Sequence, residues 1–419
     1  MTNHLSPRLL RSAPLYALLG ASFAFGVACD DDTGAGTPDV GPGDASPGDA
    51  GSDAGYVNNS RIELPATLYN YAAPTLPAHF DVESEGFHGQ QPLATTDNTP
   101  TGNPTTDEGA TLGRVLFYDV NLSQNGTIAC ASCHEAEFGF SDDRTLSVGF
   151  DGGDTGRHSM GLTNARYYGA GYFFWDQRAN TLEDQVLMPL QDPVEMGMTL
   201  DEVVARVEGA SYYEGLFAAA FGDDAVTTER ISRALAQFVR SMVSTTSRYD
   251  EGRAMVASRT NAFPNFTDAE NHGKGLFSLP PPAGGLGCFI CHQGEGFIAH
   301  EATSNGLDAD IVDRGFAGVT DAARHEGTFK VPSLRNVAVR APFMHDGRFE
   351  TLEEVIDHYS EGVQASPNLG PPFFVSDGAV APFNLTDEEK AALVAFLNTL
   401  TDEAMLADPK FSDPFVHEE

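Results

Sequence analysis

Hydrophobic positions along the chain recur mostly at the three- and four-residue spacing of an α-helix. The two clearest stripes lie at Ile231, Leu235, Phe238 and Met242, and at Leu393, Phe396, Leu397 and Leu400. This spacing places each set on one face of a helix, where it can pack against a core. Runs that alternate apolar and polar residues, as half-buried strands do, are sparse. The pattern predicts a mainly α-helical protein.

Three of the predicted helices begin with a threonine that is followed three residues later by glutamate. The pairs are Thr199 and Glu202, Thr351 and Glu354, and Thr386 and Glu389. In such a capping box, the two side chains satisfy backbone N–H groups at the start of the helix. The apolar face of the second of these helices comprises Leu352, Val355, Ile356 and Tyr359.

The chain also repeats itself. Residues 106–117 and 267–277 each open with a threonine and acidic residues and end on an apolar pair. Each segment is followed by a Cys-x-x-Cys-His pentad and then by Gly-Phe. The pentads are Cys130-Ala-Ser-Cys133-His134 and Cys288-Phe-Ile-Cys291-His292. This arrangement resembles a duplicated cytochrome c fold, in which an N-terminal helix delivers the chain to the haem and a C-terminal helix crosses it.

The pentads have the spacing of covalent haem attachment. Their two thiols can form thioethers with the vinyl groups of one haem, and the adjacent histidine can ligate its iron. A single copy could instead be half of a zinc site or a redox dithiol. Two copies, each with histidine directly after the second cysteine, predict two covalently bound haems c. We expect two cytochrome c-like domains, at residues 61–257 and 266–405, with one haem each.

The N-terminus has the composition of an export signal. Residues 1–29 combine a short basic region with an apolar run and end in Gly26-Val27-Ala28-Cys29, which is typical of a lipoprotein signal. Ordinary signal cleavage near this point is the alternative. Residues 30–60 contain seven Asp and no Lys or Arg, which predicts a disordered tether. The sequence thus predicts a protein in the periplasm or on the outer face of a bacterial membrane.

Composition narrows the partners. Sixty acidic residues against 24 Lys and Arg give a net charge of −36, which disfavours nucleic acid and anionic membrane surfaces as partners. Such charge attracts a basic electron carrier, but it equally serves solubility. The five cysteines are the four of the pentads and Cys29, so the sequence predicts no disulfide framework.

Further motifs lie between and after the pentads, namely Trp175-Asp-Gln-Arg178-Ala, Asp192-Pro-Val-Glu195-Met-Gly and Pro332-Ser-Leu-Arg335-Asn336. With the pentads, they resemble the bacterial di-haem cytochrome c peroxidase family, which includes MauG, over about residues 105–400. The resemblance implies that the N-terminal haem reacts with peroxide beneath Gln185 and Glu195. It also implies that the C-terminal haem transfers electrons and that Trp175, the only Trp, carries electrons between the haems.

The residue types suit this chemistry. Peroxide must lose a proton from one oxygen and gain one on the other, which a carboxylate of tuned pKa can provide. Simpler structural roles are the alternatives. Glu195 could cap the helix near Thr199, Gln185 could be an ordinary helix residue, and Trp175 could be a core anchor.

The sequence departs from the family at one loop. Where many members carry a histidine that ligates the peroxidatic iron at rest, this chain has Phe150. His158 could replace that ligand, but it matches the position of a family asparagine that binds an interdomain calcium ion through water. The departure argues against resting autoinhibition and against a calcium site. If calcium binds, the carbonyl groups that match are those of Arg340 and Pro342.

The distal ligand of the second haem divides the family. Many peroxidases use methionine, whereas MauG has tyrosine at the position that matches Tyr359, fourteen residues past His345. A phenolate ligand stabilises ferric iron and higher oxidation states. The alternative is that Tyr359 is a core residue and that Met344 or a water is the ligand.

The expected function is reduction of hydrogen peroxide at the N-terminal haem, with electrons relayed through the C-terminal haem from a small periplasmic cytochrome c or cupredoxin. The first alternative is MauG-like oxidation of a side chain on a partner protein. The second is a non-catalytic di-haem electron carrier, against which Gln185 and Glu195 argue. Homodimerisation is common in the family, and the sequence leaves it open.

Overall fold

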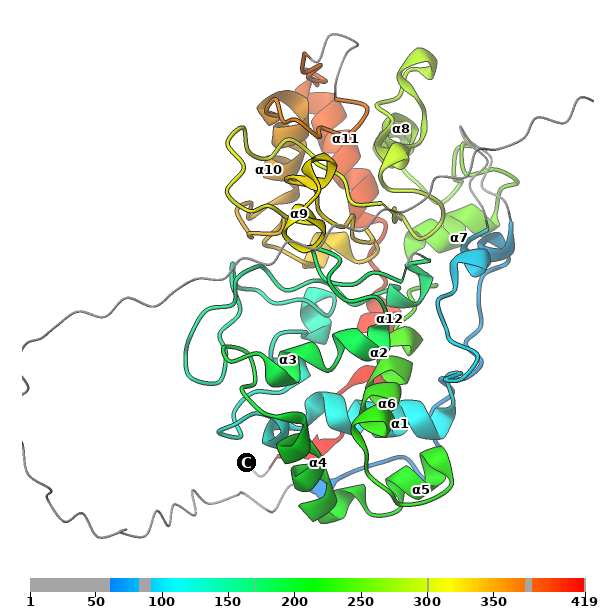
Figure 1. The fold of residues 1–419 in the computed structure, drawn as a ribbon. Helices are drawn as coiled ribbons and strands as arrows, with labels where there is room; N and C mark the ends of the chain where they lie inside the picture. The colour runs from blue at the N-terminus through cyan, green and yellow to red at the C-terminus, as the bar shows by residue number, and fades with distance from the viewer. Residues whose placement is uncertain (1–60, 83–91, 170, 300, 374–378, 418–419) are drawn as a thin grey trace, which may run out of the picture. The chain divides into compact units, whose positions relative to one another are not determined.

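Helices make up most of the secondary structure (Figure 1). The computed structural model describes residues 61–82, 92–169, 171–299, 301–373 and 379–417. The α-helices in these ranges are α1 Asp107–Tyr118, α2 Leu182–Gln185, α3 Met188–Gln191, α4 Leu200–Gly209, α5 Leu216–Phe221, α6 Thr228–Ser241, α7 Arg248–Ala254, α8 Asp268–Ser278, α9 Ala317–Thr320, α10 Leu352–Asp357, α11 Asp387–Asn398 and α12 Glu403–Leu406. The mainly α-helical prediction is confirmed. The predicted signal, Cys29 and the tether lie outside the described residues.

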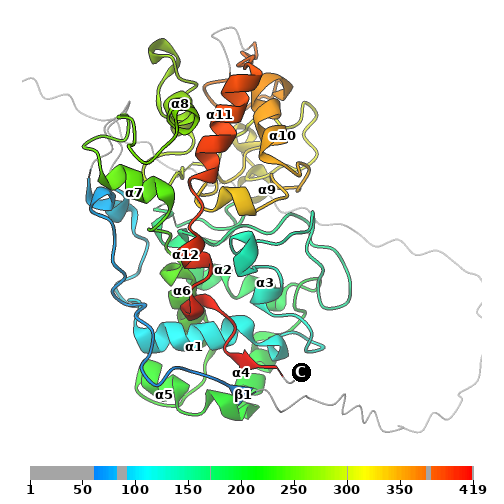
Figure 2. The same ribbon diagram turned by 180° about the vertical axis from the view of Figure 1, so that it is seen from behind.

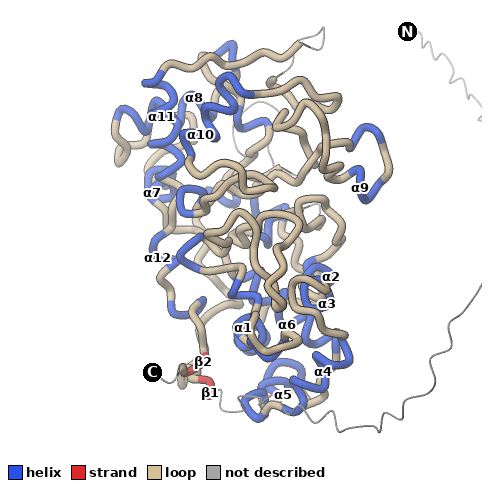
Figure 3. Tube along the Cα trace, turned by 90° about the vertical axis from the view of Figure 1, so that its left-hand side faces the viewer, coloured by secondary structure: helices blue, strands red, loops and turns tan. Residues whose placement is uncertain are grey.

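Extended structure is confined, within the described ranges, to one short antiparallel pair and isolated bridges. Strands β1 (Arg61–Ile62) and β2 (Phe415–Val416) pair the two ends of the described chain, as Figure 3 shows. No helix in the described ranges is long and apolar enough to cross a membrane.

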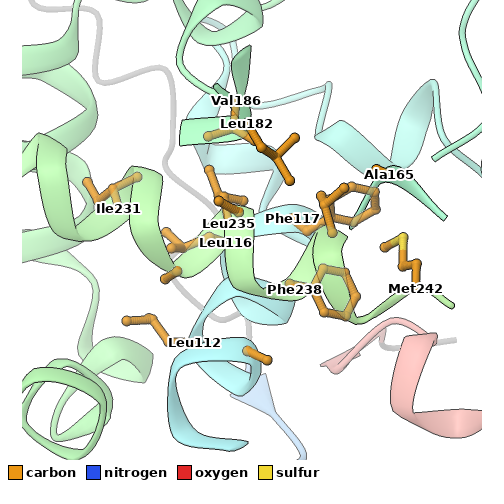
Figure 4. Packing of buried hydrophobic residues seen from close by; sticks show 14 of the residues in the cluster. Leu112, Leu116, Phe117, Ala165, Leu182, Val186, Ile231, Leu235, Phe238 and Met242 are labelled. Atoms are coloured by element: carbon orange, nitrogen blue, oxygen red, sulfur yellow. The ribbon is translucent and has the colours of Figure 1, made fainter. Parts of the chain in front are cut away.

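The first core forms where α1 crosses α6 (Figure 4). Thr106 caps α1 by accepting a hydrogen bond from the Gly109 N–H. The stripe predicted on α6 is fully buried, and it consists of Ile231, Leu235, Phe238 and Met242. At the crossing, a Cβ on Gly113 would overlap the carbonyl group of Ala234, so only glycine lets the two backbones approach this closely.

The second core repeats this arrangement with α8 and α11. Thr267 and Glu270 form a capping box at the start of α8. The predicted C-terminal stripe of Leu393, Phe396, Leu397 and Leu400 is buried. A Cβ on Gly273 would overlap the carbonyl group of Ala392, as at the first crossing. The sequence repeat thus corresponds to a repeated helix pair, and the three predicted capping boxes are all present.

Each of the two cores includes residues from the other half of the sequence. Tyr249 of α7 packs in the second core, whereas Met405 and Phe411 return to the first. Figure 2 shows this return, as the C-terminal segment leaves α11 and passes α12 on its way to β2. The Phe411 carbonyl accepts a hydrogen bond from the Tyr118 hydroxyl. The described residues belong to one compact unit, and the division at residues 257–266 stays a prediction.

Candidate functional site

The first pentad opens into a cavity of about 440 Å³. A 3₁₀ turn, Cys130–Ser132, brings the chain to Cys133 and His134, which line the cavity. Gln185, Glu195 and Trp175 line it too. The structure therefore brings together the residues that the sequence predicted for the peroxide pocket.

Backbone and side-chain contacts orient His134. Its Nδ1 lies 2.9 Å from the carbonyl oxygen of Phe140 and 3.2 Å from the hydroxyl oxygen of Ser159. Phe140 reaches this position with φ 60°, directly after Gly139 with φ 64°. Burial lowers the pKa of His134, which favours the neutral ring. A proton held on Nδ1 by a carbonyl would leave Nε2 free to ligate a haem iron.

Glu195 is a largely buried carboxylic acid in the wall of this cavity. Burial raises its pKa to about 6, the nearby Asp192 adds to the shift, and Arg178 opposes it. The loop is fixed at its backbone, because the Glu195 N–H donates to Asp192 Oδ1 at 3.2 Å. The alternative role as a helix cap belongs to Glu202, whose Oε2 accepts from the Thr199 N–H at 2.8 Å.

Phe150 and His158 occupy the positions from which a side chain could ligate the iron of the first cavity at rest. The ring of Phe150 packs over Gly197, where a Cβ would overlap it. Both ring nitrogens of His158 are occupied, with Nδ1 2.9 Å from the Arg144 carbonyl oxygen and Nε2 3.3 Å from the Ser141 hydroxyl oxygen. His158 would have to leave both partners to ligate iron.

The second pentad opens into a cavity of about 210 Å³, lined by Cys288, Cys291 and His292. Burial lowers the pKa of His292 to about 4, opposed by the carbonyl group of Phe297, which corresponds to Phe140. Its ring lies 6.2 Å from that of Phe277. Both pentad histidines thus lie beside a phenylalanine ring, but Nδ1 of His292 has no hydrogen-bond partner among the described residues, unlike Nδ1 of His134.

Tyr359 also lines the second cavity, together with the other predicted apolar-face residues Leu352, Val355 and Ile356. The structure differs from the sequence prediction here, because α10 ends at Asp357 and a π-helical turn, His358–Gly362, carries Tyr359. Such turns are frequent at functional sites. Burial raises the pKa of Tyr359 to about 12, while a hydrogen bond with the side chain of Asn305 lowers it.

Asn305 joins the two candidate distal ligands. Its side-chain amide donates to the sulfur of Met344 at 3.4 Å, and its side chain also hydrogen-bonds Tyr359. Sequence reasoning missed Asn305, which stands in no motif. Tyr359 stacks on Phe373 with ring centroids 5.5 Å apart.

The two cavities share a wall. The residues that line both are His158, Ser159, Met160, Gly161, Trp175 and Lys330. The indole N–H of Trp175 donates to the His158 carbonyl at 2.8 Å, and the Lys330 N–H donates to the Trp175 carbonyl at 2.8 Å. Trp175 is therefore fixed between the two candidate haem sites.

The donor sets fit haem better than the alternatives for a single pentad. The four cysteines form no disulfide, and the two pentads line different cavities. Burial raises the pKa of Cys130 and of Cys288 to about 12, which favours the thiol over the thiolate. Within the described ranges, no three His, Cys, Asp or Glu side chains cluster closely enough to hold a metal ion. Calcium at the carbonyl groups of Arg340 and Pro342 stays a prediction.

Sequence reasoning also missed two basic side chains of the second cavity, those of Lys330 and of Arg340, which had been singled out only for its carbonyl group. A signal exists for both. Lys330 interrupts the apolar Phe329 and Val331, and Arg340 follows three apolar residues and precedes an apolar Ala-Pro-Phe stretch.

Known proteins are similar to this chain in sequence and in fold. A family profile for di-haem cytochrome c peroxidases matches residues 107–255. The methylamine utilization protein MauG of Methylorubrum extorquens is 35% identical over 306 residues, which cover 73% of this chain and 81% of that protein. The cytochrome c551 peroxidase of Nitrosomonas europaea is 30% identical, covering 75% and 84%.

Solved structures of a MauG-like protein and of a di-haem peroxidase have a similar fold. A MauG-like protein associated with microbial copper homeostasis is 37% identical, with a TM-score of 0.64, covering 76% of this chain and 96% of that one. The di-haem peroxidase BthA of Burkholderia thailandensis, at 22% identity and a TM-score of 0.59, shares the fold. The chain belongs to the di-haem cytochrome c peroxidase family, to which MauG also belongs.

Proposed function

We propose that this protein is a di-haem c-type peroxidase that reduces hydrogen peroxide in the cavity of His134. The observation that carries the proposal is the convergence of His134, Gln185 and Glu195 on that one cavity. Haem held through Cys130 and Cys133, and through Cys288 and Cys291, would supply the redox-active iron at which peroxide is reduced and the second iron that stores an electron.

Glu195 is the proposed acid–base. With a pKa of about 6, its carboxyl group is present in both protonation states near neutral pH. An Oε atom can therefore accept a proton from one peroxide oxygen and return it to the other. The Gln185 amide can hydrogen-bond peroxide without titrating, and we assign it a positioning role.

Trp175 is the proposed electron relay, because it lies in the wall that both cavities share. The electrons would come from a small periplasmic cytochrome c or cupredoxin after export of the chain. The net charge of −36 favours encounter with a basic donor of this kind.

The Glu195→Gln variant tests the proposal. Peroxide turnover should fall about 10²-fold or more, because the proton carrier is lost, while both haems remain attached. Glu202→Gln is the matched control. Glutamine also completes a capping box, and residue 202 lines neither cavity, so its turnover should equal that of the wild type. Wild-type turnover in Glu195→Gln would rule out the acid–base role.

MauG-like oxidation of a partner protein is the second candidate. The position of Tyr359 in the cavity of His292 favours it, since a phenolate ligand would make this haem a poor acceptor of electrons from ordinary carriers. Incubation with periplasmic proteins and peroxide, followed by mass spectrometry, separates the two. Oxidised Trp or Tyr in a partner supports this candidate, whereas oxidation of reduced cytochrome c supports the peroxidase. A simple electron carrier would do neither.

A further inference from the structure

Four lysine and arginine side chains line the two cavities, and two of them lack an acidic partner in the described part of the chain. Arg157 pairs with Asp176 and Asp313, and Arg178 pairs with Asp176. Lys330 and Arg340, only 4% and 7% exposed, form no ion pair with any described residue.

Neither unpaired cation is fully satisfied by the protein. The ammonium of Lys330 lies 3.0 Å from the ring centroid of Tyr168. One guanidinium nitrogen of Arg340, Nη2, donates to the Ser333 carbonyl at 2.6 Å, but the buried Nε has no hydrogen-bond partner among the described residues. Buried charges are normally paired, so each of these positions is suited to bind an anion.

The surrounding chain makes room for Arg340. A Cβ on Gly161 would lie 2.6 Å from Nη1, and a Cβ on Gly139 would lie 2.7 Å from Cγ. Larger residues at either position would displace the guanidinium. The side chain is therefore held in a shaped channel in the wall of the cavity of His292.

We propose that Lys330 and Arg340 bind the propionate carboxylates of the haems. Arg340 lines only the cavity of His292 and would bind a propionate of that haem. Lys330 lines both cavities and would lie between propionates of the two haems. The inference rests on the haem attachment proposed above, which haem content measures separately.

A cation close to an iron favours its reduced state. Removing Lys330 should therefore lower the reduction potentials of both haems, and removing Arg340 should lower only that of the His292 haem. We expect about a tenfold change in the reduction equilibrium at each affected haem, or ~59 mV for one electron.

The test uses haem-loaded Lys330→Met and Arg340→Met in spectroelectrochemical titrations, with the two haems assigned by EPR. Lys274→Met is the matched control. Lys274 is also buried, but it donates to the carbonyl groups of Arg259 and Asn261 and lines neither cavity. Its potentials should equal those of the wild type. Haem content, determined on every variant, shows separately whether attachment itself fails.

Wild-type potentials in fully loaded Lys330→Met and Arg340→Met would overturn the proposal. If either variant does not load haem, Lys330→Arg and Arg340→Lys keep the charge and change its shape. The propionate bending bands in resonance Raman spectra should then shift at the haem concerned. Bands identical to those of the wild type would equally overturn the proposal.

Discussion

At Glu195, burial and the neighbouring Asp192 keep the carboxyl group protonated to a higher pH than usual. If the ionised form accepts the first proton, the rate of reaction with peroxide should rise with pH through about 6. Stopped-flow measurements of the rate of reaction with peroxide on either side of pH 6 would show this rise, the ascending limb of the pH–rate profile. Glu195→Gln should lack it, and a limb that persists in this variant would belong to another group.

The same pKa shift predicts a change in stability. The pKa of Glu195 is higher in the folded protein than in the unfolded chain, so its protonated form favours folding and this contribution is lost as pH rises from about 4.5 to about 6. Above pH 6, Glu195→Gln should be more stable than the wild type, by at most about 2 kcal/mol. Thermal unfolding at two pH values measures the difference, which should vanish in acid.

Tyr359 can be tested by removing one oxygen atom. If its phenolate ligates iron, Tyr359→Phe should change the absorption and EPR spectra of one haem only, because Phe cannot ligate. Tyr172→Phe is the control, since Tyr172 is 40% exposed and lines neither cavity. An unchanged spectrum in Tyr359→Phe would favour Met344 or water as the ligand.

Residue identities and spacings were enough to predict the two haem-attachment pentads, whereas Glu195 and Tyr359 were predicted from the resemblance to the family. They did not reveal the roles of the Asn305, Lys330 and Arg340 side chains. Whether a cation is buried and unpaired depends on residues that are distant in sequence, such as Tyr168 for Lys330 and Gly161 for Arg340. The apolar neighbours of each cation in the sequence indicate that it is buried, but they do not show whether it has an acidic partner.

At the scale of elements, α8 contains a matched pair of glycines. A Cβ on Gly273 would overlap the Ala392 carbonyl group, whereas a Cβ on Gly275 meets nothing within 4 Å. Gly275→Ala should stabilise the protein by about 0.5–1 kcal/mol. Gly273→Ala should destabilise it by roughly 1–3 kcal/mol despite the same gain in helix propensity. Denaturant unfolding compares the two, and equal effects would mean that α8 and α11 adjust freely.

Helix starts were predicted better than helix ends. The capping boxes at Thr199, Thr351 and Thr386 are local and are all present. The π-helical turn after α10 was not predicted. Its Ser360 is held from outside the helix, since its hydroxyl and carbonyl groups accept hydrogen bonds from the N–H groups of Leu385 and Asn384. Tertiary contacts of this kind leave no periodic signal.

At the scale of the whole molecule, a buried ion pair joins distant segments. Arg335, fully buried, donates to both carboxylate oxygens of Asp250, at 2.6 and 2.9 Å, and His79 contacts the same carboxylate. Arg335→Met should cost about 3–5 kcal/mol, because it leaves the buried Asp250 carboxylate without its guanidinium partner and with only His79 and Ser247 as contacts. Arg348→Met, at an exposed pair with Asp308, should cost at most about 1 kcal/mol. Similar losses in Tm would contradict this.

The ion pair between Arg335 and Asp250 also makes the stability of the wild type depend on pH in acid. Burial raises the pKa of Asp250, but the charge and hydrogen bonds of Arg335 and the hydrogen bond from His79 outweigh it and leave the pKa well below the usual value. The stabilisation is therefore present above the ordinary carboxyl pKa and is lost as pH falls toward the lowered one.

The return of the C-terminal segment to the first core, through Met405 and Phe411, could not be predicted from the sequence, because the contacting residues lie some 300 residues apart.

The wall that contains Trp175 and Lys330 has one more consequence. Because its residues line both cavities, we expect a substitution in this wall to change the absorption spectra of both haems. A spectrum recorded at one haem would then depend on the state of the other. An affinity or a reduction potential measured at either haem would describe the coupled pair, so that reducing one haem would change the reduction of the other, a form of cooperativity within a single chain.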